Sequence, residues 1–234
     1  SRGVYGSPRI TRHLGNNGIQ VSQPRVARLM KKIGLKSITR KKYRVCTTDS
    51  SHAYRICRNH LDRDFSAAEM GRKWVSDITY IATRQGWLYL TTVMDLADRK
   101  IIGWSLSDGM KADQTVIPAF KMAMANRKAK GTLLFHSDRG VQYACDEFKA
   151  VLKRYPVLQS MSRKGNCWDN APMESFFKSM KTEWIYHHEY LDRRQASLAV
   201  FEYIESWYNR KRLHSALGYL TPAQYEKLLL VEAA

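Results

Sequence analysis

The chain has 234 residues, enough for one large domain and a small one, and its 44% hydrophobic content can form a packed core. No apolar stretch approaches the ~20 residues that cross a bilayer, so we expect no membrane helix and a cytoplasmic location. The net charge is +18, and residues 1–48 hold twelve Lys or Arg with no Asp or Glu. So one-sided a charge favours nucleic acid as the partner, ahead of an anionic membrane.

Residues 1–48 contain the helix-start and helix-stop residues expected of a helix-turn-helix. The pair Ser7-Pro8 predicts the start of a helix that ends near Leu14, before a glycine-containing break, and Ser22 predicts the cap of a second helix that ends at Gly34. In the second helix the spacing predicts one inward face, made by Val26, Leu29, Met30 and Ile33. The opposite face predicts a DNA-binding stripe that fits a major groove, made by Arg25, Arg28 and Lys32. A helical hairpin with a solvated face is the alternative.

The segment from Lys36 to Arg44 has no apolar periodicity and predicts a basic arm along phosphates or in a minor groove. Its DNA-binding candidates are Arg40, Lys41 and Lys42. Residues 49–72 predict a linker that includes a helix. An irregular zinc site is an alternative use of this region, with Cys46, His52, Cys57 and His60 as ligands, although reduced intracellular thiols fit the cysteines better.

From Trp74 the pattern changes to that of a second domain. Alternation predicts strands at 74–82, 87–96, 100–107, 132–136 and 157–161. Helices are predicted at 112–126 and 146–154, around Glu174, and at 192–210 and 222–230, the last with a capping box at Thr221-Pro-Ala-Gln224. The order βββ-α-β-α-β-α predicts an α/β, ribonuclease H-like core with a mixed five-stranded sheet over residues 73–190, and a helical extension over 191–234. In such a fold the first and fourth strands are neighbours.

Three acids occupy positions suited to a metal site for phosphoryl transfer. Asp77 lies within the first predicted strand, Asp138 follows the fourth, and Glu174 lies in the first turn of a helix. If they converge, they offer hard oxygen ligands for two Mg²⁺ or Mn²⁺ ions. Among twenty-one acids this signal is weak by itself, and Asp95, near the end of a strand, is the strongest rival.

The flanks of Glu174 strengthen the interpretation. The preceding loop could reach a scissile phosphate and stack an aromatic ring on an unpaired base, through Arg163, Lys164 and Trp168. Lys178 and Lys181 follow Glu174 at i+4 and i+7, which places an acid and two phosphate-binding cations on one helix face. A surface ion pair between Glu174 and Lys178 is the alternative. For His136 and His214 a structural role is favoured, and Asn209, Arg210 and Arg212 suit structural and DNA-contact roles equally.

Four long motifs in order resemble the catalytic protein of the IS3 family of bacterial insertion sequences, whose DDE core is related to retroviral integrase. They are Trp74-Val-Ser-Asp-Ile-Thr-Tyr80, His136-Ser-Asp-Arg-Gly-Val-Gln-Tyr143, the segment from Ser162 to Phe177, and the segment from Tyr208 to Pro222. The resemblance implies that Asp77, Asp138 and Glu174 bind the metal ions, and that Lys178 and Lys181 contact the transposon end.

The resemblance also implies a transposase that cleaves insertion-sequence ends with Mg²⁺ and transfers the freed 3′-hydroxyl. Its partners would be double-stranded DNA, both the terminal inverted repeats and the target, at the bacterial nucleoid. Synapsis of two ends implies a homo-oligomer, at least a dimer. The chain lacks the upstream region of a full-length member. A non-catalytic regulator or domesticated remnant, and a ribonuclease H-like nuclease on RNA–DNA hybrid or branched DNA, are the competing hypotheses.

Overall fold

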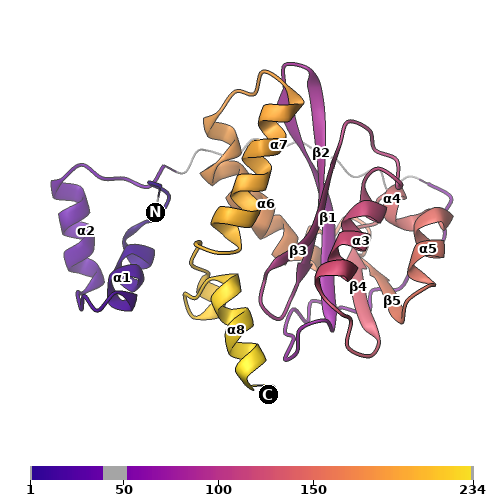
Figure 1. The fold of residues 1–234 in the computed structure, drawn as a ribbon, viewed down its shortest axis with the longest axis horizontal. Coiled ribbons are helices and arrows are strands. Elements are labelled where there is room, and N and C mark those ends of the chain that lie inside the picture. Colours follow the sequence, from indigo (N-terminus) through magenta and orange to yellow (C-terminus); the bar gives the residue numbers. More distant parts are fainter. Residues whose placement is uncertain (1, 39–51, 233–234) are drawn as a thin grey trace.

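Five strands form one mixed sheet at the centre of the molecule, seen in the computed structural model of Figure 1, which describes residues 2–38 and 52–232. They are β1 Lys73–Thr83, β2 Gly86–Asp95, β3 Ile101–Ser107, β4 Leu133–Ser137 and β5 Val157–Met161, in the order β3-β2-β1-β4-β5. β1 to β3 form an antiparallel meander, whereas β4 runs parallel to β1 and β5 parallel to β4. The predicted fold and the pairing of the first and fourth strands are confirmed.

Alternating side chains of β1 enter two separate cores, one on each face of the sheet. Val75 and Ile81 pack with the helices α6 Ala171–Glu183 and α7 Arg193–Phe201. Trp74 and Ile78 face the other core, which contains α3 Val116–Asn126 and α5 Asp146–Leu152; the short helix α4 Val141–Ala144 precedes α5. α3 packs closely on β3 at Gly103. Only glycine fits there, because a Cβ would lie 2.3 Å from the Ala119 carbonyl oxygen.

The C-terminal helices differ in part from the prediction. The single helix predicted over 192–210 is α7 followed by a π-helical segment, Glu202–Tyr208. Tyr203, Ile204, Trp207 and Tyr208 of this segment are all buried in the core. The last helix, α8 Pro222–Glu232, begins as predicted. Thr221 and Gln224 exchange hydrogen bonds between side chain and backbone at 2.9 and 3.2 Å, which is the expected capping box.

Two helices, α1 Ser7–Asn16 and α2 Gln23–Lys32, form the N-terminal module, defined here as residues 2–38. Gly6, not Ser7, occupies the N-cap of α1. The predicted inward face of α2 is wrong in part: Val26 is buried, but Leu29 and Ile33 are 49% and 65% exposed. With only α1 packed against it within the described part of the chain, α2 has one partner and buries one narrow stripe.

Residues 52–66 form an extended strap along β5 and contain none of the helix predicted for the linker. The backbone N–H groups of His60 and Leu61 donate to Ser160 Oγ at 2.8 and 3.2 Å, and Cys57 Sγ donates to Gln159. His52 bonds the Arg139 carbonyl, and the fourth ligand of the alternative zinc site, Cys46, lies outside the described residues. A membrane-spanning helix is absent from the part of the chain that the structure describes.

Candidate active site

Asp77 and Asp138 lie side by side where β4 ends. The parallel register pairs Val75 with His136, and two further residues along each chain bring Asp77 beside Asp138. Each carboxylate accepts a local backbone hydrogen bond, Asp77 from Ile78 at 2.8 Å and Asp138 from Gly140 at 2.9 Å. These bonds hold two half-buried acids on neighbouring inner strands of the sheet, beside the C-terminal end of β4.

The site carries excess negative charge. Burial raises the pKa of Asp77 well above its usual value, and the charges of Asp138 and Glu174 raise it further, against the opposing effect of Lys181. Burial, with Asp77 and Asp138 nearby, likewise raises the pKa of the Tyr143 hydroxyl. Glu174, in the first turn of α6, is exposed to solvent. The three predicted acids therefore share one electrostatic environment, and it is one that attracts cations.

The donor set fits a hard divalent ion in its chemistry. Mg²⁺ and Mn²⁺ prefer carboxylate oxygens as ligands. Neither ion requires a sulfur or imidazole donor. Within residues 2–38 and 52–232, no three His, Cys, Asp or Glu side chains are already grouped as a metal site. Asn170 Oδ1, in the residue that precedes α6, is buried without a hydrogen-bond partner. Asp77 and Asp138 are thus two neighbouring carboxylates, and the exposed Glu174 is a third carboxylate in the same electrostatic environment.

A polar network that the sequence interpretation missed fixes the strand next to Asp77. Ser76 Oγ and the buried Tyr143 hydroxyl lie 2.7 Å apart, and Asn170 Nδ2 donates to the Ser76 carbonyl at 3.0 Å. Asn170 thereby connects the strand of Asp77 to the start of the helix of Glu174. All three residues lie in the motifs quoted above, but their roles depend on contacts across 67 and 94 residues that no local pattern encodes.

The loop before α6 is fixed by Asp169, whose side chain is fully buried. Its carboxylate accepts three bonds from Arg163, through the backbone N–H and the guanidinium, at 2.7–2.9 Å. From the strap, Arg63 and Asn59 donate to the same carboxylate at 2.9 and 3.1 Å. The predicted DNA ligand Arg163 is thus engaged within the protein, while Lys164 is exposed. The side chain of Trp168 is 67% exposed, on the loop that these contacts with Asp169 fix in place.

The two lysines of α6 occupy different environments. Lys178 is exposed, one turn beyond Glu174. The Lys181 ammonium lies 4.8 Å from the centre of the Tyr80 ring, and burial lowers the pKa of Lys181 while Asp77 raises it. The structure therefore places Lys181 where it interacts electrostatically with Asp77, and leaves Lys178 facing solvent on the same helix.

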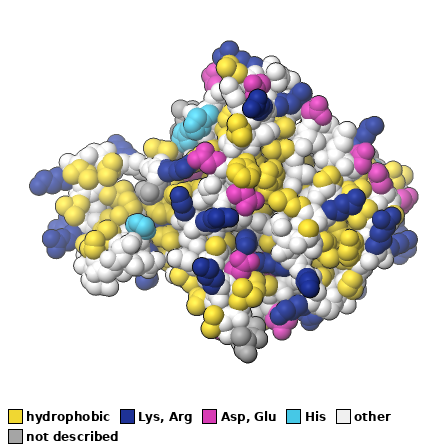
Figure 2. Space-filling view, in the orientation of Figure 1, with side chains coloured by type: hydrophobic (Ala, Val, Ile, Leu, Met, Phe, Trp, Pro, Cys, Tyr) yellow, Lys and Arg dark blue, Asp and Glu magenta, His cyan; other side chains and the backbone are white. Residues whose placement is uncertain are grey.

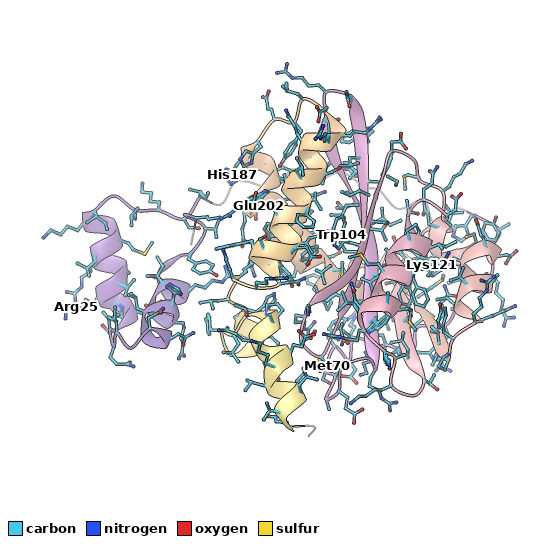
Figure 3. The ribbon with its side chains drawn as sticks, in the orientation of Figure 1. Arg25, Met70, Trp104, Lys121, His187 and Glu202 are labelled. Carbon is cyan, nitrogen blue, oxygen red and sulfur yellow. The ribbon has the colours of Figure 1, made fainter. Side chains whose placement is uncertain are left out.

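The predicted basic stripe of α2 is open to solvent. Arg25, Arg28 and Lys32 are all exposed, and Arg25, labelled in Figure 3, lies on the helix remote from the core. Figure 2 shows Lys and Arg side chains gathered at the outer edge of the module. The arm residues Arg40, Lys41 and Lys42 fall outside the described residues.

The rival acid and the buried histidines have structural roles. Asp95 is completely buried, accepts hydrogen bonds from Gly71, Trp74 and Ala97, and pairs with Arg127 at 2.9 Å. His136 lies between Ser160 and Ser162, and burial lowers its pKa to about 4. Asn209 bonds both backbone groups of Ile101, and Arg212 is buried against Glu183. These residues hold the fold together.

Known protein families and solved structures are similar to this chain in sequence or in fold. Integrase core domain families match residues 67–167 and 174–230, and an HTH-like domain family matches residues 1–43. The fold resembles a simian T-cell lymphotropic virus intasome chain, with a TM-score of 0.57 at 14% identity over 92% of this chain and 69% of that chain. It also resembles the HTLV-2 integrase catalytic core solved with magnesium, with a TM-score of 0.50 at 16% identity over 66% and 95%.

One curated relative is similar along nearly the whole sequence. Transposase InsF for insertion sequence IS3A of Escherichia coli (strain K12) is 41% identical over 97% of this chain and 78% of its own length. That identity spans the N-terminal module, the strap and the core with its three acids. The chain therefore belongs to the IS3 family of insertion-sequence transposases, built on a ribonuclease H-like integrase core.

Proposed function

We propose that this transposase cleaves DNA at the ends of its insertion sequence in a Mg²⁺-dependent reaction and joins the freed 3′-hydroxyl to target DNA. The observation that supports it is the proximity of Asp77 to Asp138, with Glu174 contributing to the same electrostatic environment. We assign the three acids as metal ligands and catalytic residues. The HTLV-2 integrase catalytic core, whose fold this chain resembles, is in complex with magnesium in its solved structure.

The chain's own residues would position the reacting groups. Two bound Mg²⁺ or Mn²⁺ ions would activate the attacking oxygen and stabilise the leaving oxygen. Asp77 and Asp138 are held by backbone hydrogen bonds, so they can bind ions without reorganising, while the exposed Glu174 can approach once positive charge is present. No serine or tyrosine is required as a covalent nucleophile.

We assign the DNA contacts to three surfaces around this site. Lys178 and Lys181 would bind phosphates of the transposon end, and Lys164 and Arg163 phosphates beside the loop. Trp168, exposed on that loop, would stack on an unpaired base. The stripe Arg25, Arg28 and Lys32, with the arm Arg40, Lys41 and Lys42, would bind the terminal inverted repeat. Two such ends need at least two protomers, which we place at the bacterial nucleoid.

This assignment implies a division of labour along the chain. We propose a DNA-binding region over residues 1–48, a connecting segment over 49–72, a catalytic core over 73–190 and a helical extension over 191–234. The connecting segment also contributes Asn59 and Arg63 to the loop that carries Trp168.

Single amide substitutions test the assignment. Asp77→Asn, Asp138→Asn and Glu174→Gln should each lower strand transfer by at least a hundredfold in Mg²⁺ while DNA binding stays within about threefold. The exposed Asp108→Asn is the matched control and should retain full activity. Strand transfer by Asp138→Asn at the wild-type rate would overturn the proposal.

A further inference from the structure

The N-terminal module is attached to the core by a set of contacts that sequence reasoning did not foresee. Tyr5 is buried, and its hydroxyl accepts from the Leu213 N–H at 2.8 Å and donates to the Lys211 carbonyl at 3.3 Å. Val4, also buried, and Ile10 belong to the same core cluster as the helices behind the active site. The connection is therefore a packed interface.

Cationic side chains of the module extend this interface on both sides of Tyr5. Arg2 pairs with Glu202, labelled in Figure 3, at 2.8 Å, and stacks 4.4 Å from the Trp184 ring. Arg12 lies 5.4 Å from the Tyr219 ring, and Arg9 lies 3.8 Å from Glu183. Ion pairs and cation–π contacts of this kind add directional attraction to the packing around Tyr5. Together they hold α1 in one orientation.

The receiving surface is a C-terminal turn, residues 211–220, with an unusual backbone. Tyr219 has a left-handed φ of +65°, a strained conformation for an aromatic residue. Hydrogen bonds from Tyr219 to His214 and from His214 to Leu220, at 2.8 and 2.9 Å, maintain it. The strained turn directs the Tyr219 ring towards Arg12, so its conformation serves the interface.

The interface also lies close to the catalytic helix. Glu183 is the last residue of α6 and lies nine positions after Glu174, a rise of about 13.5 Å along the helix axis. In Figure 1, α2 lies on the far side of α1 from the core. The basic stripe of α2 is therefore held at a fixed position relative to Asp77 and Asp138.

We propose that this docking of the module within one chain selects the phosphodiester that is cut, with Arg2, Tyr5 and Arg12 as specificity-determining residues. The inference rests on the proposed function. DNA bound by α2 reaches the acids at a set distance, and one base step is only about 3.4 Å along the helix axis. A module free to shift by that much would offer neighbouring phosphates to the same acids.

The test compares cleavage positions in Arg2→Ala/Tyr5→Phe/Arg12→Ala with those of the wild-type chain. The DNA is an end-labelled duplex that carries the inverted repeat flanking the chain's own gene, incubated with Mg²⁺ or Mn²⁺ and resolved at single nucleotides. The triple variant should divide its products over several adjacent phosphates, with the original product reduced at least twofold and the total cleavage within about threefold of wild type. Arg28→Ala, which changes the DNA-binding stripe alone, is the control: it should bind more weakly and cut at the wild-type position.

Each outcome decides the proposal. A single wild-type product from the triple variant would overturn it, and so would loss of all cleavage, because the core residues are unchanged. If the triple variant does not fold, Tyr5→Phe/Arg12→Ala keeps the contacts of Arg2 with Glu202 and Trp184 and should broaden cleavage in the same direction. Absence of cleavage by the wild-type chain would instead contradict the proposed function.

Discussion

Arg212 and Glu183 form a buried, two-pronged ion pair, in which Nε and Nη2 donate to the two carboxylate oxygens at 2.8 and 2.6 Å. The pair connects the end of α6 to the C-terminal turn, and Arg212 also donates to Ser179. Because both groups are about 95% buried, removal of either one would leave the other charge buried without its two-pronged partner.

Arg212→Met should therefore lower the free energy of unfolding by about 3–5 kcal/mol, since the buried Glu183 carboxylate loses its two-pronged partner and keeps only the weaker contact with Arg9, 3.8 Å away. The double variant Arg212→Met/Glu183→Leu should recover most of that loss, because no charge then remains to be solvated. Urea unfolding of both variants measures the difference. Equal stability of the single and double variants would contradict the interpretation.

An Asp→Asn substitution should change protein stability in opposite directions at Asp77 and at the buried Asp95. The pKa of Asp77 is raised in the folded state, so its ionisation costs stability as pH rises from ~3.9 towards the raised value, and the full cost is present above it. Asp77→Asn should then stabilise the metal-free protein at pH 7, and the gain should vanish near pH 4.

Asp95→Asn is the counterpart, because it weakens the buried pairing with Arg127 and should destabilise by about 2–4 kcal/mol. Thermal unfolding in EDTA measures both effects. Added Mg²⁺ should raise the melting temperature of the wild-type chain but not of Asp77→Asn, since ligand binding stabilises only a protein that retains the site. A destabilised Asp77→Asn at pH 7 would refute the assignment of charge repulsion.

Local patterns predicted the strands of the sheet because each strand has a recognisable pattern within its own segment. Alternation along β1 and the apolar run before Asp138 identify both strands, and the neighbour relation of first and fourth strands in this fold then brings Asp77 to Asp138. The strap was not predictable in this way. Asn59 and Arg63 act on an acid 110 and 106 residues away, so nothing in their own segment indicates their role. The exposure of Leu29 likewise depends on how many helices pack on α2, which its own periodicity does not specify.

The hydrogen bonds that Arg163, Arg63 and Asn59 donate to Asp169, called here the Asp169 clamp, lead to a prediction about catalysis. An amide at this position cannot accept equally from Arg63 and Arg163, so Asp169→Asn should loosen the loop that precedes Glu174. Strand transfer should fall roughly tenfold, equivalent to about 1.4 kcal/mol of activation free energy, with less effect on DNA affinity. Asp62→Asn removes the exposed partner of Arg163, 3.5 Å away, and should leave the rate unchanged. Identical rates for the two variants would show that the clamp has no catalytic consequence.

His214 gives the chain a specific sensitivity to acid. Burial, and then the charges of Arg212, Arg99 and Arg9, lower its pKa to about 3, while the ring bonds the Tyr208 hydroxyl at 3.1 Å. The unfolded chain takes up this proton near pH 6.5 and the folded chain does not, so the contribution is complete above pH 6.5. It is then lost as pH falls towards 3, by up to about 1.4 kcal/mol per pH unit.

Urea unfolding between pH 7 and pH 4 should therefore show a shallower decline in His214→Gln than in wild type, because glutamine has no proton to exclude and can still bond Tyr208. The matched control is His188→Gln, which replaces an exposed histidine and should keep the wild-type slope. If His214→Gln and wild type lose stability in parallel over this range, the acid sensitivity belongs to other groups. A shallower slope would show that the same turn that receives Arg12 also excludes a proton from the interior.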